Sequence, residues 1–112
     1  MNLRFKANRS SLESEIKADV MSYLRAIPGC YPRIIQIGVI PGRSNASKGL
    51  PDVWVVIRGT TFWIEIKRSK GRVSKEQQEF INNATRCGAN VLVARSLRDV
   101  ILYVSAILEK TR

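Results

Sequence analysis

The spacing of apolar residues along the chain changes between two periods, one typical of helices and one typical of strands. Apolar residues three or four positions apart predict helices, and short runs of β-branched and aromatic residues predict strands. The predicted helices cover residues 10–26, 74–87 and 96–110, and the predicted strands cover residues 31–39, 53–57, 62–67 and 90–94. This order, helix, three strands, helix, strand, helix, predicts an α/β fold with a mixed sheet flanked by helices.

The second and third predicted strands form a hairpin, because a glycine-containing turn separates two apolar runs. Asp52 opens the first strand of this hairpin, and Glu65 and Lys67 close the second. Residues two apart on a strand share one face, and an antiparallel hairpin brings the start of one strand beside the end of the other. We therefore expect Asp52, Glu65 and Lys67 to converge at one end of the sheet.

Two carboxylates and an amine at one end of a sheet favour a site for a metal ion and a phosphate. Carboxylates are the ligands that Mg²⁺ takes, together with waters and the substrate's phosphate. A lysine beside the ion can orient a water or neutralise the phosphate. The alternative is that Asp52 caps a turn and Glu65 pairs with Lys67 on an exposed face. Because Glu65 directly follows the apolar run 62–64, where a charge is costly, the pattern favours a functional role.

The side-chain composition narrows the chemistry and the partner. The chain has no histidine, which excludes Ser-His-Asp and Cys-His catalysis and histidine-based zinc sites. Its 19 basic and 9 acidic residues give a net charge of +10, which favours a polyanion such as DNA as partner, although solubility alone also explains a basic surface. Cys30 and Cys87 have no metal-binding spacing, and we predict that both are buried or partly buried thiols.

The length of 112 residues is enough for one hydrophobic core, so we predict a single domain over residues 1–112. Residues 1–9 are basic and weakly patterned, which is typical of a loose arm or a flexible terminus. No apolar run approaches the about 20 residues that span a bilayer, and no apolar segment follows the first basic residues as in a secretory signal. We therefore expect a cytoplasmic protein that does not bind membranes.

The first helix carries a candidate for a third carboxylate at the site. At about 100° per residue, Glu13 lies on the same side of the helix as Val20 and Leu24. Glu15 instead lies on the polar side. Glu13 is therefore the better candidate, although it also has the spacing to form a capping box with Ser10. The two roles of Glu13 are compatible.

Further polar residues extend the candidate site. Gln77 lies three positions before Phe80, on the inner side of the second helix, although a surface glutamine would have the same spacing. The candidate DNA-binding residues are Arg33, Arg43, Lys48, Arg68, Lys70, Arg72 and Lys75. The last four belong to residues 68–75, which we call the basic turn. A solvated strand edge explains Arg33 equally well, and many loops carry cations without binding a phosphate.

Several of these residues together resemble a nuclease family. Pro51-Asp52 followed by Glu65-Ile66-Lys67 is similar to the signature of the PD-(D/E)xK nuclease superfamily. The longer series that resembles the VRR-NUC (virus-type replication-repair nuclease) family is Lys48-Gly49-Leu50-Pro51-Asp52, Glu65-Ile66-Lys67, Gly71-Arg72, Ser74 and Gln77. Glu13 also matches the family's helix glutamate, which precedes an isoleucine by three positions. The resemblance spans about residues 10–95 and implies a restriction-endonuclease-like αβββαβ core.

The resemblance implies a metal-dependent DNA endonuclease that uses Mg²⁺ or Mn²⁺ and no small-molecule cofactor. The implied site residues are Asp52, Glu65, the backbone carbonyl of Ile66 and Glu13 as metal ligands, Lys67 for the attacking water, and Gln77 beside Lys67 or the scissile phosphate. As a stand-alone domain of this small size, the chain resembles the phage and bacterial members of the family, which act as homodimers on branched DNA such as four-way (Holliday) junctions. A homodimer suits a junction because one site cuts one strand and the junction needs two symmetric cuts. The implied process is DNA repair in a bacterial or phage-infected cell.

Two other functions remain open from the sequence. A non-catalytic DNA-binding module on the same fold would explain the charge and the basic loops, but it has no need of two carboxylates beside bound phosphate. A sequence-specific restriction-type endonuclease would usually need an added recognition segment, for which 112 residues leave little room.

Overall fold

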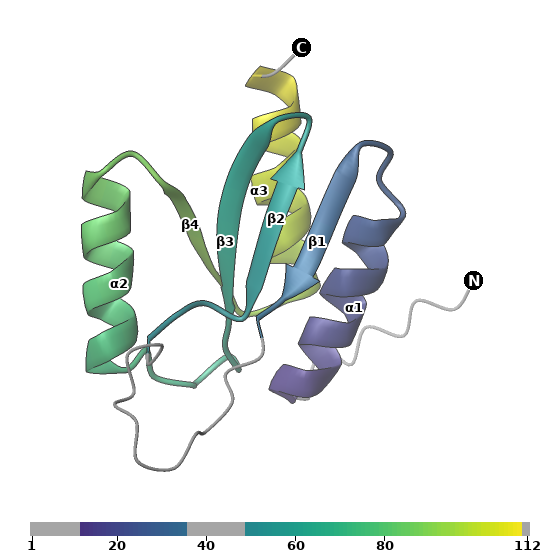
Figure 1. Cartoon of the computed structure of the whole chain (residues 1–112). Coiled ribbons are helices and arrows are strands. Elements are labelled where there is room, and N and C mark those ends of the chain that lie inside the picture. Colours follow the sequence, from purple (N-terminus) through teal and green to yellow (C-terminus); the bar gives the residue numbers. More distant parts are fainter. Residues whose placement is uncertain (1–11, 36–48, 111–112) are drawn as a thin grey trace.

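A computed structural model of the protein describes residues 12–35 and 49–110. It contains three helices and four strands in the predicted order within these ranges (Figure 1). The elements are α1 (Glu13–Arg25), β1 (Cys30–Ile34), β2 (Val53–Ile57), β3 (Thr60–Ile66), α2 (Lys75–Arg86), β4 (Asn90–Ala94) and α3 (Leu97–Lys110). The predicted α/β class and mixed sheet are therefore confirmed.

The four strands form one sheet in the order β1-β2-β3-β4. Neighbouring pairs are antiparallel from β1 to β3, whereas β3 and β4 are parallel. Arg58 and Gly59 join β2 to β3 with φ angles of 49° and 83°. Positive φ at both positions is the geometry of a type I′ turn, whose twist matches that of the flanking strands. α2 supplies the crossover that the parallel pair requires.

One face of the sheet carries the hydrophobic core. Alternate residues of β2 and β3 point to this face and are fully or almost fully buried against α1 and α3. Phe62 contacts Tyr103 of α3, with ring centroids 5.7 Å apart. Trp63, one position along β3, points the other way and meets Phe80 of α2 at 5.6 Å. α2 therefore packs on the face opposite α1 and α3, and Glu65 shares that face with Trp63.

Three sequence-based expectations differ from the structure. The first helix begins at Glu13 with Leu12 as N-cap, so Glu15, and not Glu13, reaches back to the N-cap: its Oε1 accepts the Leu12 N–H at 3.0 Å. The spacing of apolar residues predicts a buried stripe on α3 that consists of Val100, Ile101, Val104 and Leu108. Val100 and Val104 are fully buried and Leu108 is partly buried, but Ile101 is 37% exposed. Cys87 is exposed, although Cys30 is partly buried as predicted.

Other expectations fall outside the described residues. The first strand ends at Ile34, and residues 36–39 of the predicted strand lie outside the described ranges. The same holds for the expected arm over residues 1–9 and for the whole loop over residues 40–48, with Arg43 and Lys48. Among the helices of the described ranges, none is both long enough and apolar enough to cross a membrane.

Candidate active site

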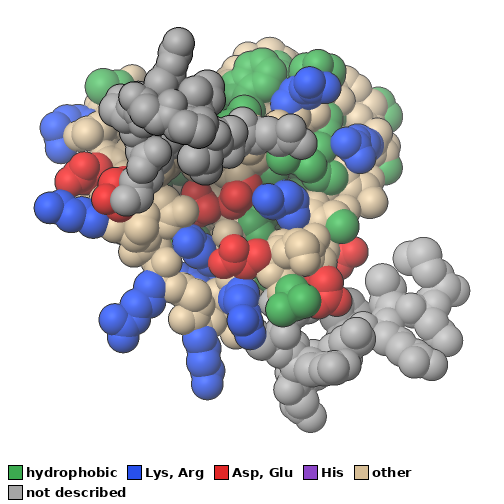
Figure 2. All heavy atoms as spheres, turned by 60° about the horizontal axis from the view of Figure 1, so that its bottom comes forward, with side chains coloured by type: hydrophobic (Ala, Val, Ile, Leu, Met, Phe, Trp, Pro, Cys, Tyr) green, Lys and Arg blue, Asp and Glu red, His purple; other side chains and the backbone are tan. Residues whose placement is uncertain are grey.

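One end of the sheet gathers the candidate site residues. The start of β2, the ends of β3 and β4, and the first turns of α1 and α2 all lie at the lower end of the molecule in Figure 1. Val53 pairs with Ile64 across the hairpin, so Asp52, just before Val53, lies beside Glu65 and Ile66. In Figure 2, which turns this end forward, acidic side chains lie next to Lys and Arg side chains.

Asp52 is held in place through both of its carboxylate oxygens. Its Oδ2 accepts the backbone N–H of Ile66 at 2.7 Å, and its Oδ1 lies 3.5 Å from Nζ of Lys17 on α1. The backbone carbonyl of Asp52 also accepts the N–H of Ile35 at 2.8 Å, just after β1. Asp52 is therefore fixed by contacts from β1, β3 and α1, which is the kind of support that a positioned metal ligand needs.

Glu65 is the only charged side chain among the buried residues of the described ranges, with 3% of its surface exposed. Its Oε1 accepts a hydrogen bond from Nε2 of Gln77 at 3.1 Å. Its Oε2 is buried and has no hydrogen-bond partner among the described residues. A buried carboxylate oxygen without a hydrogen-bond partner costs free energy, and a proton or a bound cation would remove this cost.

Burial raises the pKa of Glu65 to about 8. Asp52 adds to the increase, since a protonated Glu65 can share a hydrogen bond with it and since two negative charges repel. The positive charge of Lys67 acts in the opposite direction and lowers the pKa, whereas Glu13 raises it. Without a cation, Glu65 therefore keeps a proton near neutral pH.

The two carboxylates fit a divalent cation such as Mg²⁺. An unpartnered buried oxygen beside a second fixed carboxylate is a donor pair of the kind that Mg²⁺ uses, since this ion usually keeps several waters and takes only one or two carboxylates. Across residues 12–35 and 49–110, no group of three or more His, Cys, Asp or Glu side chains is arranged to hold a metal ion. Glu13 therefore does not complete a three-carboxylate cluster with Asp52 and Glu65.

Gln77 reaches the site from the first turn of α2. Ser74 caps this helix: its Oγ accepts the Gln77 N–H at 3.1 Å, while Oε1 of Gln77 accepts the Ser74 N–H at 2.8 Å. This reciprocal capping box fixes the Gln77 side chain, so that its Nε2 is left to donate to Glu65. The structure therefore brings Gln77 to Glu65, and no contact with Lys67 is seen within the described ranges.

Glu13 and Lys67 lie at the edge of this group. Lys67 directly follows β3 and is partly buried, and its backbone N–H donates to the carbonyl of Ala94 at 2.9 Å. Glu13 is exposed, although its Oε1 would lie 3.6 Å from a Cβ placed on Gly71 of the basic turn. Both charges are close enough to shift the pKa of Glu65. Glu13 thus borders the site from the solvent side and does not point into the core.

The predicted DNA-binding residues are distributed around this end of the sheet. In the basic turn, the side chains of Arg68, Lys70 and Arg72 are exposed. Lys75 is exposed at the first position of α2. Arg33 is exposed on β1, where it pairs with Trp54 of β2. The exposed cations of the described residues thus come from β1, the basic turn and the start of α2.

Two residues of this region, Lys17 and Arg95, were not anticipated from the sequence, and Gly49 was noted only as part of the series that resembles the family. Lys17 contacts Asp52, and its position four residues after Glu13 on one helix face is a signal that could have found it. Arg95 contacts the basic turn from β4, for which the sequence offers no local signal. Gly49 has a φ of +97°, and a Cβ there would lie 2.6 Å from the carbonyl oxygen of Glu76, so the chain before Asp52 passes directly against α2.

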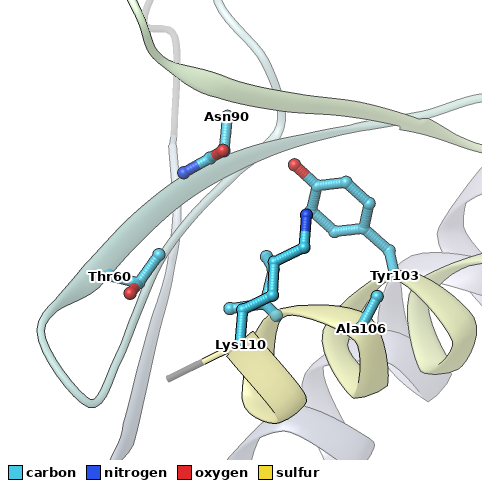
Figure 3. Close-up of a pocket in the computed structure, with 6 residues that line it drawn as sticks. Thr60, Asn90, Tyr103, Ala106 and Lys110 are labelled. Atoms are coloured by element: carbon cyan, nitrogen blue, oxygen red, sulfur yellow. The ribbon is translucent and has the colours of Figure 1, made fainter. Parts of the chain in front are cut away.

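A cavity of about 300 Å³ lies away from these residues (Figure 3). Its lining comes from the start of β3, the start of β4 and the second half of α3, namely Thr60, Asn90, Tyr103, Ala106, Ile107 and Lys110. Thr60 begins β3, whereas Glu65 lies near its end, so the cavity is at the opposite end of the sheet. It is not part of the candidate site.

Comparisons with known proteins agree with this fold. The sequence profile of the VRR-NUC domain matches residues 12–97. A solved structure described as a VRR_NUC domain superposes with a TM-score of 0.67 and 24% identity, covering 83% of this chain and 94% of that one, which shows a shared fold. A comparison with curated protein sequences finds no significant match. The profile match includes Glu13, Asp52, Glu65, Lys67 and Gln77, and the chain belongs to the VRR-NUC family of nuclease-type domains.

Proposed function

We propose that this domain is a divalent-metal-dependent endonuclease that hydrolyses phosphodiester bonds in DNA. The observation that carries the proposal is the pairing of Asp52 with Glu65, in which Glu65 is buried and keeps an unpartnered oxygen beside a second carboxylate. A purely DNA-binding surface gains nothing from two carboxylates, because they repel the phosphate backbone. A cation of charge +2 would remove this repulsion and use the orphaned oxygen.

The proposed roles follow from the positions of the side chains. Asp52, Glu65 and the carbonyl of Ile66 would hold Mg²⁺ or Mn²⁺, which when bound lowers the pKa of a water and offsets the charge that develops on phosphorus. Gln77 donates to Oε1 of Glu65, which leaves the buried Oε2 for the ion. Lys67, at the rim, would orient the attacking water or neutralise the phosphate. Glu13 would act from the solvent side of the site.

DNA is the proposed substrate because cations surround this carboxylate pair in a chain of net charge +10. The exposed cations of the basic turn directly follow Lys67 and can contact phosphates on either side of the scissile bond. We further propose branched DNA, such as a four-way junction, as the preferred substrate and a homodimer as the active form. Support for both comes from the likeness to small members of the family and from the need for two symmetric cuts.

A cleavage assay tests the proposal. Junction, flap, single-stranded and duplex DNA of related sequence are incubated with the protein in Mg²⁺, Mn²⁺ or EDTA, and sedimentation measures the oligomeric state. We expect cleavage in Mg²⁺ or Mn²⁺, none in EDTA, and the fastest cleavage on the junction by a dimer. Binding of every substrate without cleavage in either metal would instead identify a non-catalytic DNA-binding module. Cleavage of duplex DNA at one base sequence would identify a restriction-type enzyme.

A further inference from the structure

Arg95 places its guanidinium group against the backbone of the basic turn. Its Nη1 lies 2.7 Å from the carbonyl oxygen of Arg68, 2.7 Å from that of Gly71 and 3.4 Å from that of Ser69. The same segment is closed by a hydrogen bond from the Gly71 N–H to the carbonyl of Arg68 at 3.0 Å. One side chain from the end of β4 thus contacts three of the four carbonyl groups of residues 68–71.

Arg95 is itself held on a rigid base. It directly follows β4, and its backbone N–H donates to Oδ2 of Asp99 in the first turn of α3 at 2.9 Å. The preceding residue, Ala94, is fully buried, and its carbonyl accepts the N–H of Lys67 at 2.9 Å. The sheet, the start of α3 and the beginning of the basic turn therefore meet at Arg95.

The contacts of Arg95 hold backbone carbonyl groups of the basic turn, while the cationic side chains of the turn stay exposed to solvent. Because the carbonyls of Arg68 and Gly71 point toward the guanidinium, they are directed away from an approaching phosphate. The side chains of Arg68, Lys70 and Arg72 are exposed. Cations close together in a short turn repel one another, so the turn needs an attachment to keep one conformation. Hydrogen bonds from a charged guanidinium to carbonyl groups are among the stronger attachments available.

The segment of the basic turn that Arg95 contacts also lies beside the candidate active site. Gly71 lies against the side chain of Glu13, whose Oε1 would be 3.6 Å from a Cβ at this position. Arg95 thus holds the turn on one side, and Glu13 lies beside it on the other. The distance between the cations and the scissile phosphate depends on this placement.

We propose that Arg95 is a positioning residue for DNA binding, which holds the basic turn so that its cations contact the DNA backbone next to the catalytic carboxylates. The inference rests on the proposed function, because it assumes that DNA is the substrate. Arg95 does not itself touch the DNA; it acts through the backbone of residues 68–71.

The matched control for Arg95 is Arg98. Arg98 lies three residues away in α3 and is exposed, and no hydrogen bond or ion pair of its side chain is seen among the described residues. Arg95→Gln and Arg98→Gln each remove one positive charge from the same region, but only Arg95→Gln removes the hydrogen bonds to the backbone of the basic turn. A difference in DNA binding between the two variants therefore measures the effect of these hydrogen bonds and not the effect of the lost charge.

The first experiment measures junction-DNA binding by both variants in an Asp52→Asn background that does not cleave, over a range of salt. We expect Arg95→Gln to weaken binding about tenfold more than Arg98→Gln, because contacts of several cations are lost together. The log–log salt slope should flatten by more than the about 0.9 units that one phosphate contact contributes. In the active protein, Arg95→Gln should raise KM and leave kcat within about twofold of the wild type. Arg95→Lys should rescue only part of the binding, since an ammonium group lacks the planar fork.

A second readout does not depend on DNA. The basic turn contains trypsin sites at Arg68, Lys70 and Arg72, and mass spectrometry separates cleavage there from cleavage elsewhere. We expect faster cleavage of the turn in Arg95→Gln than in Arg98→Gln or the wild type, because a released turn fits a protease more easily. Equal rates of trypsin cleavage in the turn, or equal DNA affinities of the two variants, would overturn the proposed role of Arg95 but not the proposed function. A wild-type protein that binds no DNA would overturn the proposed function as well.

Discussion

Gln77 in the first turn of α2 donates a hydrogen bond from Nε2 to Oε1 of Glu65 on β3, at 3.1 Å. The other end of the same amide accepts the N–H of Ser74 and caps the helix. One side chain therefore fixes both the start of α2 and the orientation of the buried carboxylate. The local capping of a helix and the geometry of the candidate metal site are coupled through Gln77.

This coupling predicts different effects of two variants at the same helix end. Gln77→Ala and Ser74→Ala each remove part of the capping box and should each lower the free energy of unfolding by about 1 kcal/mol. Only Gln77→Ala frees Glu65, so only this variant should lower kcat, by about tenfold. Denaturant unfolding and single-turnover cleavage measure the two effects. A similar loss of kcat in Ser74→Ala would mean that the cap, and not the contact with Glu65, supports activity.

The carboxylate pair predicts a loss of cleavage with retained binding. Asp52→Asn keeps an oxygen that can accept the Ile66 N–H, and Glu65→Gln keeps one that can accept from Gln77, so both variants should fold. Each should reduce cleavage by about 10² or more, because an electrostatic contribution to the transition state is lost. Gel-shift and cleavage assays in Mg²⁺ test both statements. Full activity in either variant would contradict the assignment of the site.

Substitutions of the two glutamates of α1 should have different effects, one on cleavage and the other on stability. Glu13 borders the basic turn and raises the pKa of Glu65, whereas Glu15 caps the helix at Leu12. Glu13→Gln should therefore slow cleavage more than Glu15→Gln does. Glu15→Gln should lower the unfolding free energy by about 0.5–1 kcal/mol at most, since Gln can keep part of the cap. Cleavage rates in the reverse order would make Glu15 the residue of the site.

The raised pKa of Glu65 predicts how the stability of the metal-free protein depends on pH. The pKa of Glu65 rises from its ordinary value of 4.5 to about 8, so between these pH values the folded protein holds a proton that the unfolded chain has released. Stability should therefore fall as pH rises through this window, because the unfolded state binds fewer protons. Urea unfolding in EDTA at several pH values measures this loss.

Glu65→Gln is the control for this pH dependence, since it removes the titrating group and should flatten the loss of stability between pH 5 and 8. Adding Mg²⁺ to the wild type should reduce the loss as well, because a cation favours the charged form of Glu65. The same pH dependence in wild type and variant would show that Glu65 does not titrate in this range.

The close approach of Gly49 to α2 predicts a position that tolerates no side chain. Gly49 and Gly59 both have positive φ, at +97° and +83°, but only Gly49 has backbone within reach of an added Cβ. Gly59→Ala should cost about 1 kcal/mol from backbone strain alone. Gly49→Ala should cost more and should also slow cleavage, since the clash with Glu76 displaces the segment that carries Asp52. Equal costs for the two variants would show that the chain before Asp52 moves aside without loss.

Local patterns in the sequence were sufficient for the elements and for one relationship within the site. The β2–β3 hairpin follows from two apolar runs and a glycine turn, and a hairpin places the residue before its first strand beside the end of its second. Asp52 and Glu65 come together for this reason alone. The ends of α2 and the bounds of β4 likewise follow from Ser74, Gly88 and a short apolar run.

The tertiary structure decided the contacts between elements that are distant in the sequence. Helical spacing placed Ile101 in the same apolar stripe of α3 as Val100 and Val104. Only the packing of α3 against the sheet and α1 shows that Val100 and Val104 are buried while Ile101 is exposed. Lys17 meets Asp52, and Arg95 meets the basic turn, because the sheet sets how α1 and the end of β4 lie against the hairpin. Periodicity specifies which side of an element is apolar, whereas the partner of a polar side chain depends on the positions of all elements at once.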